Sequence, residues 1–169
     1  MDGSAGPTAA SPVDFSQADL LQENQLRIGS PDPHQPLPEN LSSHELLSLA
    51  RAHIQSARQS ITAAARPFAG KGSLFSRHYH DAITRLNTSI EHAHYLLELL
   101  PAILTRLLEQ ETATLFTKHE EIKVEIYRMI DEAERLILLL QKENEKDRQN
   151  IVQKADALEK LLQELLLAF

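Results

Sequence analysis

Eight histidines are the residues of this chain best suited to chemistry, because a neutral imidazole can bind a divalent metal ion. Four of them form two pairs, His78 with His80 and His92 with His94, each separated by two positions. Residues two apart on a helix point to different sides, so neither pair can share one ion. His94 and Glu98 have the i, i+4 spacing of helical zinc ligands, but the pattern supplies no third ligand. We therefore expect solvated or interface histidines and no metal site.

Signatures of enzymes are missing from the sequence as well. The chain has no cysteine, which excludes disulfides, thiolate metal sites and cysteine nucleophiles. Lys71-Gly72-Ser73 is similar to the end of a phosphate-binding loop, but neither the upstream glycine of that motif nor a preceding strand accompanies it. The Gly-x-Ser-x-Gly of serine hydrolases is absent, and the acid pair Glu120-Glu121 fits a solvated helix face. The sequence predicts no enzyme, no cofactor and no catalytic residue.

The first forty residues differ in composition from the rest of the chain. They hold six of the eight prolines, three of the five glycines, and six acids against one base. We predict a disordered acidic tail over residues 1–40. Its segment Asp14–Ile28 carries five large apolar residues, which either form a helical recognition motif or are incidental.

The remaining residues have the composition of a helical protein with mixed charge. Leucine, isoleucine and alanine dominate the apolar residues, and only 5% of the chain is aromatic. After residue 40 there are 18 acids against 16 bases, which argues against direct binding to a nucleic acid backbone. No apolar stretch reaches the roughly 20 residues of a transmembrane segment, and the start of the chain lacks the features of a signal peptide. We expect an intracellular protein of the cytoplasm or nucleus.

Two amphipathic helices are predicted between residues 41 and 100. Ser42 and Glu45 have the spacing of a capping box, which predicts a helix from there to about residue 66, ended by Pro67. Ser73 can cap a second helix that runs to Leu100. The short connection between them predicts an antiparallel hairpin. Pro101 then either begins a third helix or kinks a longer one.

The strongest periodic signal is a coiled-coil seam, in which apolar residues recur at alternating steps of four and three. Ten polar residues, 141–150, divide the seam into two parts and contain no glycine or proline. These good helix formers favour one continuous helix of roughly 65 residues, or near 100 Å. The two parts of the seam are Ile122, Ile126, Met129, Ala133, Leu136 and Leu140, and then Ile151, Ala155, Leu158, Leu162, Leu165 and Phe169.

A helix of that length would extend well beyond the hairpin, so its distal seam would need another chain to cover it. The sequence therefore predicts an all-α protein, with a tail (1–40), a helical hairpin (41–117) and a long C-terminal coiled-coil helix (118–169). In the alternative, residues 141–150 form a loop and the last helix folds back to close a four-helix bundle. The predicted partner-binding residues are Ile151, Leu158, Leu162, Leu165, Leu166 and Phe169.

These elements predict a non-enzymatic subunit of a multiprotein complex that binds other helical chains, with a different chain favoured over a second copy. A hairpin followed by a coiled coil is similar to the small subunits of kinetochore, lysosome-positioning and transcription-mediator complexes. The hairpin also resembles the microtubule-interacting-and-trafficking module. That second resemblance implies an alternative function, a trafficking adaptor that binds partner peptides through the hairpin.

Overall fold

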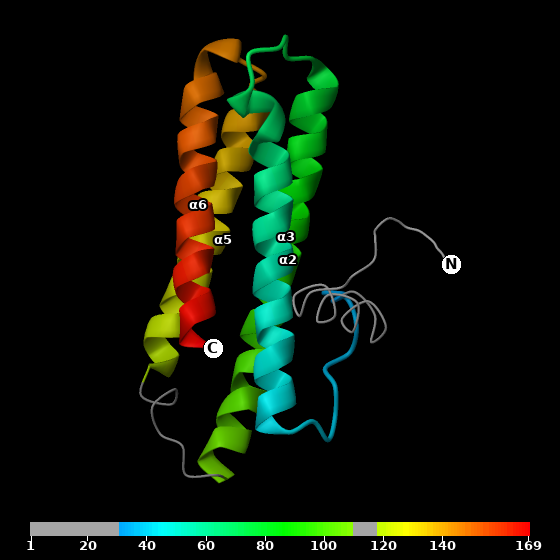
Figure 1. Ribbon diagram of the computed structural model, residues 1–169, viewed down its shortest axis with the longest axis vertical. Coiled ribbons are helices and arrows are strands. Elements are labelled where there is room, and N and C mark those ends of the chain that lie inside the picture. The colour runs from blue at the N-terminus through cyan, green and yellow to red at the C-terminus, as the bar shows by residue number, and fades with distance from the viewer. Residues whose placement is uncertain (1–30, 110–117) are drawn as a thin grey trace, which may run out of the picture. The chain divides into compact units, whose positions relative to one another are not determined.

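Four α-helices pack around a shared apolar core in the computed structural model (Figure 1). The structure describes residues 31–109 and 118–169, of which 82% are helical and none lies in a strand. No helix in these ranges has the length and apolar character needed to cross a bilayer. The elements are α2 (Ser43–Ala69), α3 (Ser76–Glu109), α5 (His119–Gln141), a short 3-10 helix η1 (Glu145–Asp147) and α6 (Arg148–Ala168).

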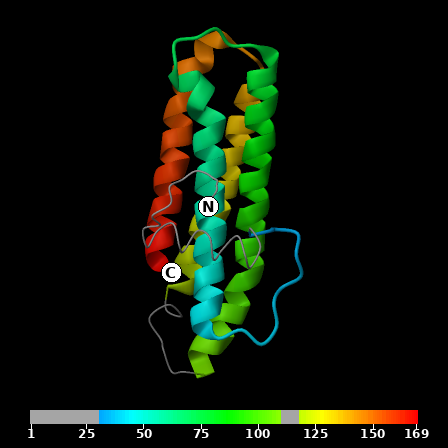
Figure 2. The same cartoon turned by 45° about the vertical axis from the view of Figure 1, so that its right-hand side comes forward.

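The four helices form a ring in which each packs mainly against two neighbours. α2 contacts α3 and α6, and α5 also contacts α3 and α6. Each helix runs antiparallel to the next along the chain, as two views of the bundle show (Figures 1 and 2). This is the up-and-down arrangement of a four-helix bundle. The helices on both sides of the predicted boundary at residue 118 contribute to one core.

The beginning of α2 confirms the predicted capping box. The Ser42 hydroxyl accepts a hydrogen bond from the Glu45 amide at 3.1 Å, and the Glu45 carboxylate accepts one from the Ser42 amide at 3.0 Å. These two bonds satisfy two of the amides that a helix start leaves without partners. The helix continues past Pro67 to Ala69, because Phe68 is buried and its ring meets that of Tyr79 at a centroid distance of 5.1 Å.

Of the two alternatives at Pro101, the structure has the longer helix, since α3 passes through this proline and ends at Glu109 rather than at Leu100. A proline inside a helix removes one backbone hydrogen bond and costs about 3 kcal/mol. Buried residues on both sides, Leu100 and Ile103, anchor the helix in the core across that gap. The predicted apolar position at Leu115 lies outside the described residues.

The prediction of one continuous helix through residues 141–150 is also wrong. α5 ends at Gln141, Glu143 adopts a φ of 48°, and α6 begins at Arg148. The Asn144 side chain accepts from the Lys146 amide at 3.0 Å and starts η1. α6 therefore reverses direction and packs against α5, so the two parts of the seam lie in the same core. This folded-back arrangement is the alternative that the sequence left open.

Arg148 joins the two turns at one end of the bundle, which we call the Arg148 end. Its Nε donates to the Phe68 carbonyl at 3.0 Å, and its Nη2 donates to the carbonyls of Pro67 at 3.2 Å and Gly72 at 2.8 Å. In the same region the Ser76 hydroxyl donates to the Glu143 carboxylate at 2.6 Å. Hydrogen bonds thus join the start of α6 to the end of α2 and the turn after it, and the turn after α5 to the start of α3.

Residues 1–30 of the predicted tail, with the segment Asp14–Ile28, lie outside the described residues. From Asp32 onward the chain belongs to the same unit as the helices. His34 Nε2 lies 3.2 Å from a Glu91 carboxylate oxygen, and the Tyr95 hydroxyl lies 3.4 Å from the Pro36 carbonyl. Both contacts place this segment against α3.

Candidate partner-binding groove

The six residues predicted to bind a partner are placed by the structure in or against the chain's own core. Ile151, Leu158 and Leu162 are each 2% exposed and Leu165 is 4% exposed, while Leu166 and Phe169 are partly buried against the same core. The reason is the turn after α5, which brings α6 back onto α2 and α5. The bare distal seam on which the prediction depended is not present in this fold.

A groove of about 600 Å³ lies at the opposite end from Arg148, where α5 begins and α6 ends. We call this the groove end of the bundle. The buried side chains of Ile122 and Leu165 line it, together with Val124 from α5 and Ala168 from α6. Its volume is within the range of about 300–1,000 Å³ typical of ligand pockets. Only Leu165 among its lining residues belongs to the predicted site.

Acidic side chains dominate the charge of this groove. Glu120, Glu121 and Glu125 of α5 and Glu164 of α6 line it, against the single base Lys118. Glu125 has a neighbour in Arg128, whose Nη1 lies 3.6 Å from its carboxylate. In residues 31–109 and 118–169, the other three carboxylates form no ion pair or hydrogen bond. The groove therefore carries negative charge that the described part of the chain does not neutralise.

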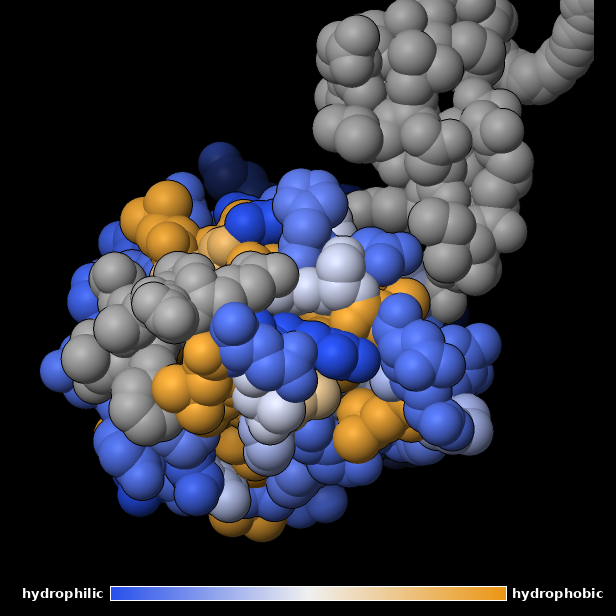
Figure 3. Space-filling view, turned by 90° about the horizontal axis from the view of Figure 1, so that it is seen from below, coloured by the Kyte–Doolittle hydropathy of each residue, from blue (hydrophilic) through white to orange (hydrophobic). Residues whose placement is uncertain are grey.

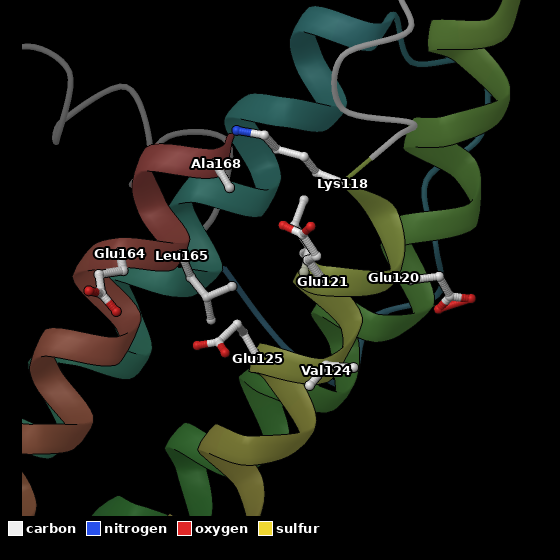
Figure 4. A pocket seen from close by; sticks show the side chains of 9 residues that line it. Lys118, Glu120, Glu121, Val124, Glu125, Glu164, Leu165 and Ala168 are labelled. Carbon is white, nitrogen blue, oxygen red and sulfur yellow. The ribbon is translucent and has the colours of Figure 1, made fainter.

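The side chains differ in how they point at the groove (Figure 4). Glu121 and Glu125 project from α5 into the space that faces α6, and Leu165 projects from α6 toward Glu125. Lys118 extends toward Ala168 at the end of α6, whereas Glu120 points to the other side of α5. The groove thus combines an apolar base with carboxylates at its sides.

Several exposed apolar residues also lie toward the groove end. Val124 is 60% exposed, Tyr127 is 52% exposed on the next turn of α5, and Leu167 is 85% exposed at the end of α6. Leu108 near the end of α3 is 53% exposed. Seen onto this end, apolar patches lie among charged side chains (Figure 3). Exposed apolar residues that lie singly are ordinary on a protein surface, so Val124, which lines the groove, is the one of these four that bears on the site.

Two histidines, His53 of α2 and His92 of α3, lie in the core beside this end. They are 1% and 5% exposed, and their Nδ1 atoms are 2.8 Å apart, so one ring donates and the other accepts. Burial and the neighbouring His92 lower the pKa of His53 to about 4, and burial also lowers the pKa of His92. The Tyr95 ring packs on His53 with centroids 4.3 Å apart.

The sequence analysis expected histidines in solvent or at an interface and missed this pair. His53 follows Leu46 by seven positions, which is the helical spacing of a core residue and could have identified it. The pair has no third ligand: in the described ranges, no group of three His, Asp or Glu side chains could hold a metal ion. Its role in this fold is a neutral hydrogen bond between two helices.

In comparisons with known proteins, no protein family, curated protein or solved structure matches this chain.

Proposed function

We propose that this protein is a non-enzymatic helical subunit of a larger multiprotein complex, and that it binds its partner through the groove between α5 and α6. The observation that carries the proposal is the composition of that groove. The groove has a volume of about 600 Å³ and an apolar base. Three of the carboxylates that line it form no ion pair in the described part of the chain.

This proposal moves the partner contact away from the coiled-coil seam. The seam stabilises the chain's own bundle, and burying it a second time against a partner would require the bundle to open. The groove needs no such rearrangement, because Val124, which lines it, is already exposed. Full burial of one such side chain contributes about 1.5–3 kcal/mol.

The charged and apolar residues of the groove would have separate roles in binding. The apolar base and Val124 would supply affinity as they leave water. The carboxylates of Glu121 and Glu164 would direct the approach of the partner and set its orientation. Such a division between an apolar centre and a polar rim is typical of protein interfaces.

Site-specific photo-crosslinking in the native cell tests the proposal. A crosslinking amino acid at Val124, in the groove, should form adducts with another protein. The same amino acid at Leu138 should not, although Leu138 is 62% exposed on the same helix. Adding Glu121→Lys to the variant that carries the crosslinker at Val124 should reduce the amount of adduct. Equal crosslinking at both positions, or crosslinking at neither, would contradict the proposal.

A further inference from the structure

We propose that the occupant of the α5–α6 groove is a basic amphipathic helix, in which lysines or arginines flank an apolar stripe. This inference rests on the proposed function, because it names the chemical class of the partner at the same groove.

The unneutralised charge of the groove selects a cationic partner. Glu121 and Glu164 lie on opposite helices, and neither forms an ion pair in the part of the chain that the structure describes, where Lys118 is the one base lining the groove. An acidic partner would bring like charges together, which costs several kcal/mol at an interface. A partner with bases on both sides of its apolar stripe would instead meet a carboxylate on each wall.

The ends of the two helices leave this preference to the carboxylates. α6 has no basic residue in its own last turn, but the Arg51 guanidinium of α2 donates to the Phe169 carbonyl at its end. α5 begins there, and Glu120 and Glu121 in its first turn already interact with its partial positive charge. Both helix ends thus already have partners of opposite charge, and the carboxylates that line the groove supply its attraction for a cation.

The shape of the groove favours a helical partner over an extended one. Its walls are two antiparallel helices, and the described residues offer no strand edge to which an extended peptide could add. The apolar side chains on one face of a partner helix could contact Ile122 and Leu165 at the base of the groove. The volume of about 600 Å³ accommodates the side chains of such a face.

Charge also argues against two other occupants. The apolar segment Asp14–Ile28 of this chain carries Asp14, Asp19 and Glu23 against the single base Arg27, so the groove would repel it. A second copy related by a two-fold axis would place the same carboxylates against one another. Both occupants conflict with the groove, whereas a basic helix complements it.

Three synthetic peptides of about 18 residues, long enough to form a helix, test the proposal with the full chain. The first has leucines at i, i+3, i+4 and i+7 and lysines elsewhere. The second replaces each lysine with glutamate, and the third has the composition of the first in scrambled order. Binding is measured by fluorescence anisotropy and peptide helicity by circular dichroism. The first peptide should bind and gain helicity, and the other two should bind at least about tenfold more weakly.

Matched variants separate the groove from the overall negative charge of the chain. Glu121→Lys and Val124→Asn should each weaken binding of the first peptide about tenfold or more. The controls are Glu134→Lys, at an exposed position on α5, and Leu138→Asn, at the Arg148 end of α5. Each control makes the same chemical change outside the groove, so binding should change less than about threefold.

Several results would overturn the proposal. If the glutamate peptide binds as well as the lysine peptide and Val124→Asn weakens both, the groove binds proteins of another class and the proposed function survives. Equal binding of the scrambled peptide would show charge attraction alone. If no peptide binds, the partner class is wrong, and the absence of crosslinking at Val124 would then reject the proposed function too.

The two other occupants have their own readouts. The chain has no cysteine, so cysteines introduced at Val124 and Leu21 would form a disulfide within one chain if the segment Asp14–Ile28 filled the groove. A second copy would appear as a dimer in light scattering that Val124→Asn dissociates. Either result would overturn the proposal of a basic helix.

Discussion

The two ends of the bundle are held together by different kinds of contact. At the Arg148 end, three hydrogen bonds from one guanidinium join the end of α2 and the turn after it to the start of α6, and Glu143 accepts from Ser76. At the groove end, α2 is joined to the end of α6 by a hydrogen bond from the Arg51 guanidinium to the Phe169 carbonyl. No hydrogen bond or ion pair in those residues joins α5 to α6.

This difference shows that polar contacts between helices are more numerous at the Arg148 end than at the groove end of the described residues. The apolar core continues through both ends, because Leu140 and Ile122 are equally well buried. What differs between the two ends is the number of hydrogen bonds that join the helices and turns to one another. Binding surfaces are commonly drawn from the less constrained parts of a structure.

The largest expected effect comes from charges placed in the part of the seam next to the groove. Leu162→Asp together with Leu165→Asp would bury two carboxylates in the shared core, at a cost of several kcal/mol. We expect all four helices to unfold, as measured by circular dichroism and hydrogen exchange. Leu167→Asp is the control and should leave the fold intact, since Leu167 is 85% exposed. If α2 and α3 stayed protected in the double variant, the two ends would be independent.

Acid should weaken the groove end through the histidine pair. The folded pKa of His53 is about 4 against 6.5 when free, and that of His92 is also lowered. Between pH 6.5 and 4 the unfolded chain therefore binds protons that the folded chain excludes, so the free energy of unfolding falls as pH falls. For His53 the loss is about 3 kcal/mol near pH 4.

Urea denaturation across this pH range measures the effect. The variant His53→Leu/His92→Leu should lose most of the pH dependence. The small cavity beside the pair is lined by no charged residue from the described parts of α5 or α6. Asp32 raises the pKa of both histidines and Glu91 raises that of His92, but burial outweighs both acids. An unchanged slope in the variant would assign the acid sensitivity to other groups.

Loss of the guanidinium tests the Arg148 end. Arg148→Met keeps the aliphatic packing but leaves three backbone carbonyls without their donor, and should cost about 2 kcal/mol in the free energy of unfolding. Amides in the turns at residues 70–75 and 142–147 should exchange faster. Arg148→Lys should not restore stability, because one ammonium cannot match the planar fork of the guanidinium.

The control for Arg148 is Arg135→Ala, which removes an exposed ion pair to Asp131 and should cost less than about 0.5 kcal/mol. Equal effects of the two substitutions would mean that the turns at the Arg148 end are not held by this side chain.

The smallest expected effect concerns the cap of α2 at the groove end. Ser42→Ala removes the acceptor for the Glu45 amide and should lower the free energy of unfolding by about 1 kcal/mol. Ser42→Asp should retain most of the stability, because aspartate is also a favoured cap. A loss from Ser42→Ala larger than that from Arg148→Met would reverse the comparison between the two ends.

Local features of this protein could be predicted from the sequence, and features that depend on distant contacts could not. The capping box at Ser42 and the apolar stripes follow from neighbouring residues. The turn after α5 did not, since residues 141–150 favour a helix when taken alone. Arg148 binds the Phe68 carbonyl from 80 positions away, and this contact helps to hold the turn. The sequence left two alternatives open at Pro101, and the burial of Leu100 and Ile103 on both sides of it favours the longer helix.

The candidate groove was beyond sequence analysis for a related reason. The seam residues were correctly identified as apolar positions that require cover, but the sequence did not show that α2 and α5 supply it. Leu165 is the one predicted residue that lines the groove. The groove exists because α6 ends beside the first turns of α5. Its carboxylates come from the beginning of α5 and the end of α6, which are far apart in the sequence and are brought together by the fold.

The ring arrangement of the helices also has a consequence for how the chain folds. Three of the four packed pairs join helices that follow one another along the described chain, and only α2 with α6 brings distant segments together. Proteins dominated by such local contacts fold in microseconds to milliseconds. Substitutions between α2 and α6, such as at Thr62, whose hydroxyl donates to Glu159, should therefore speed unfolding more than they slow folding.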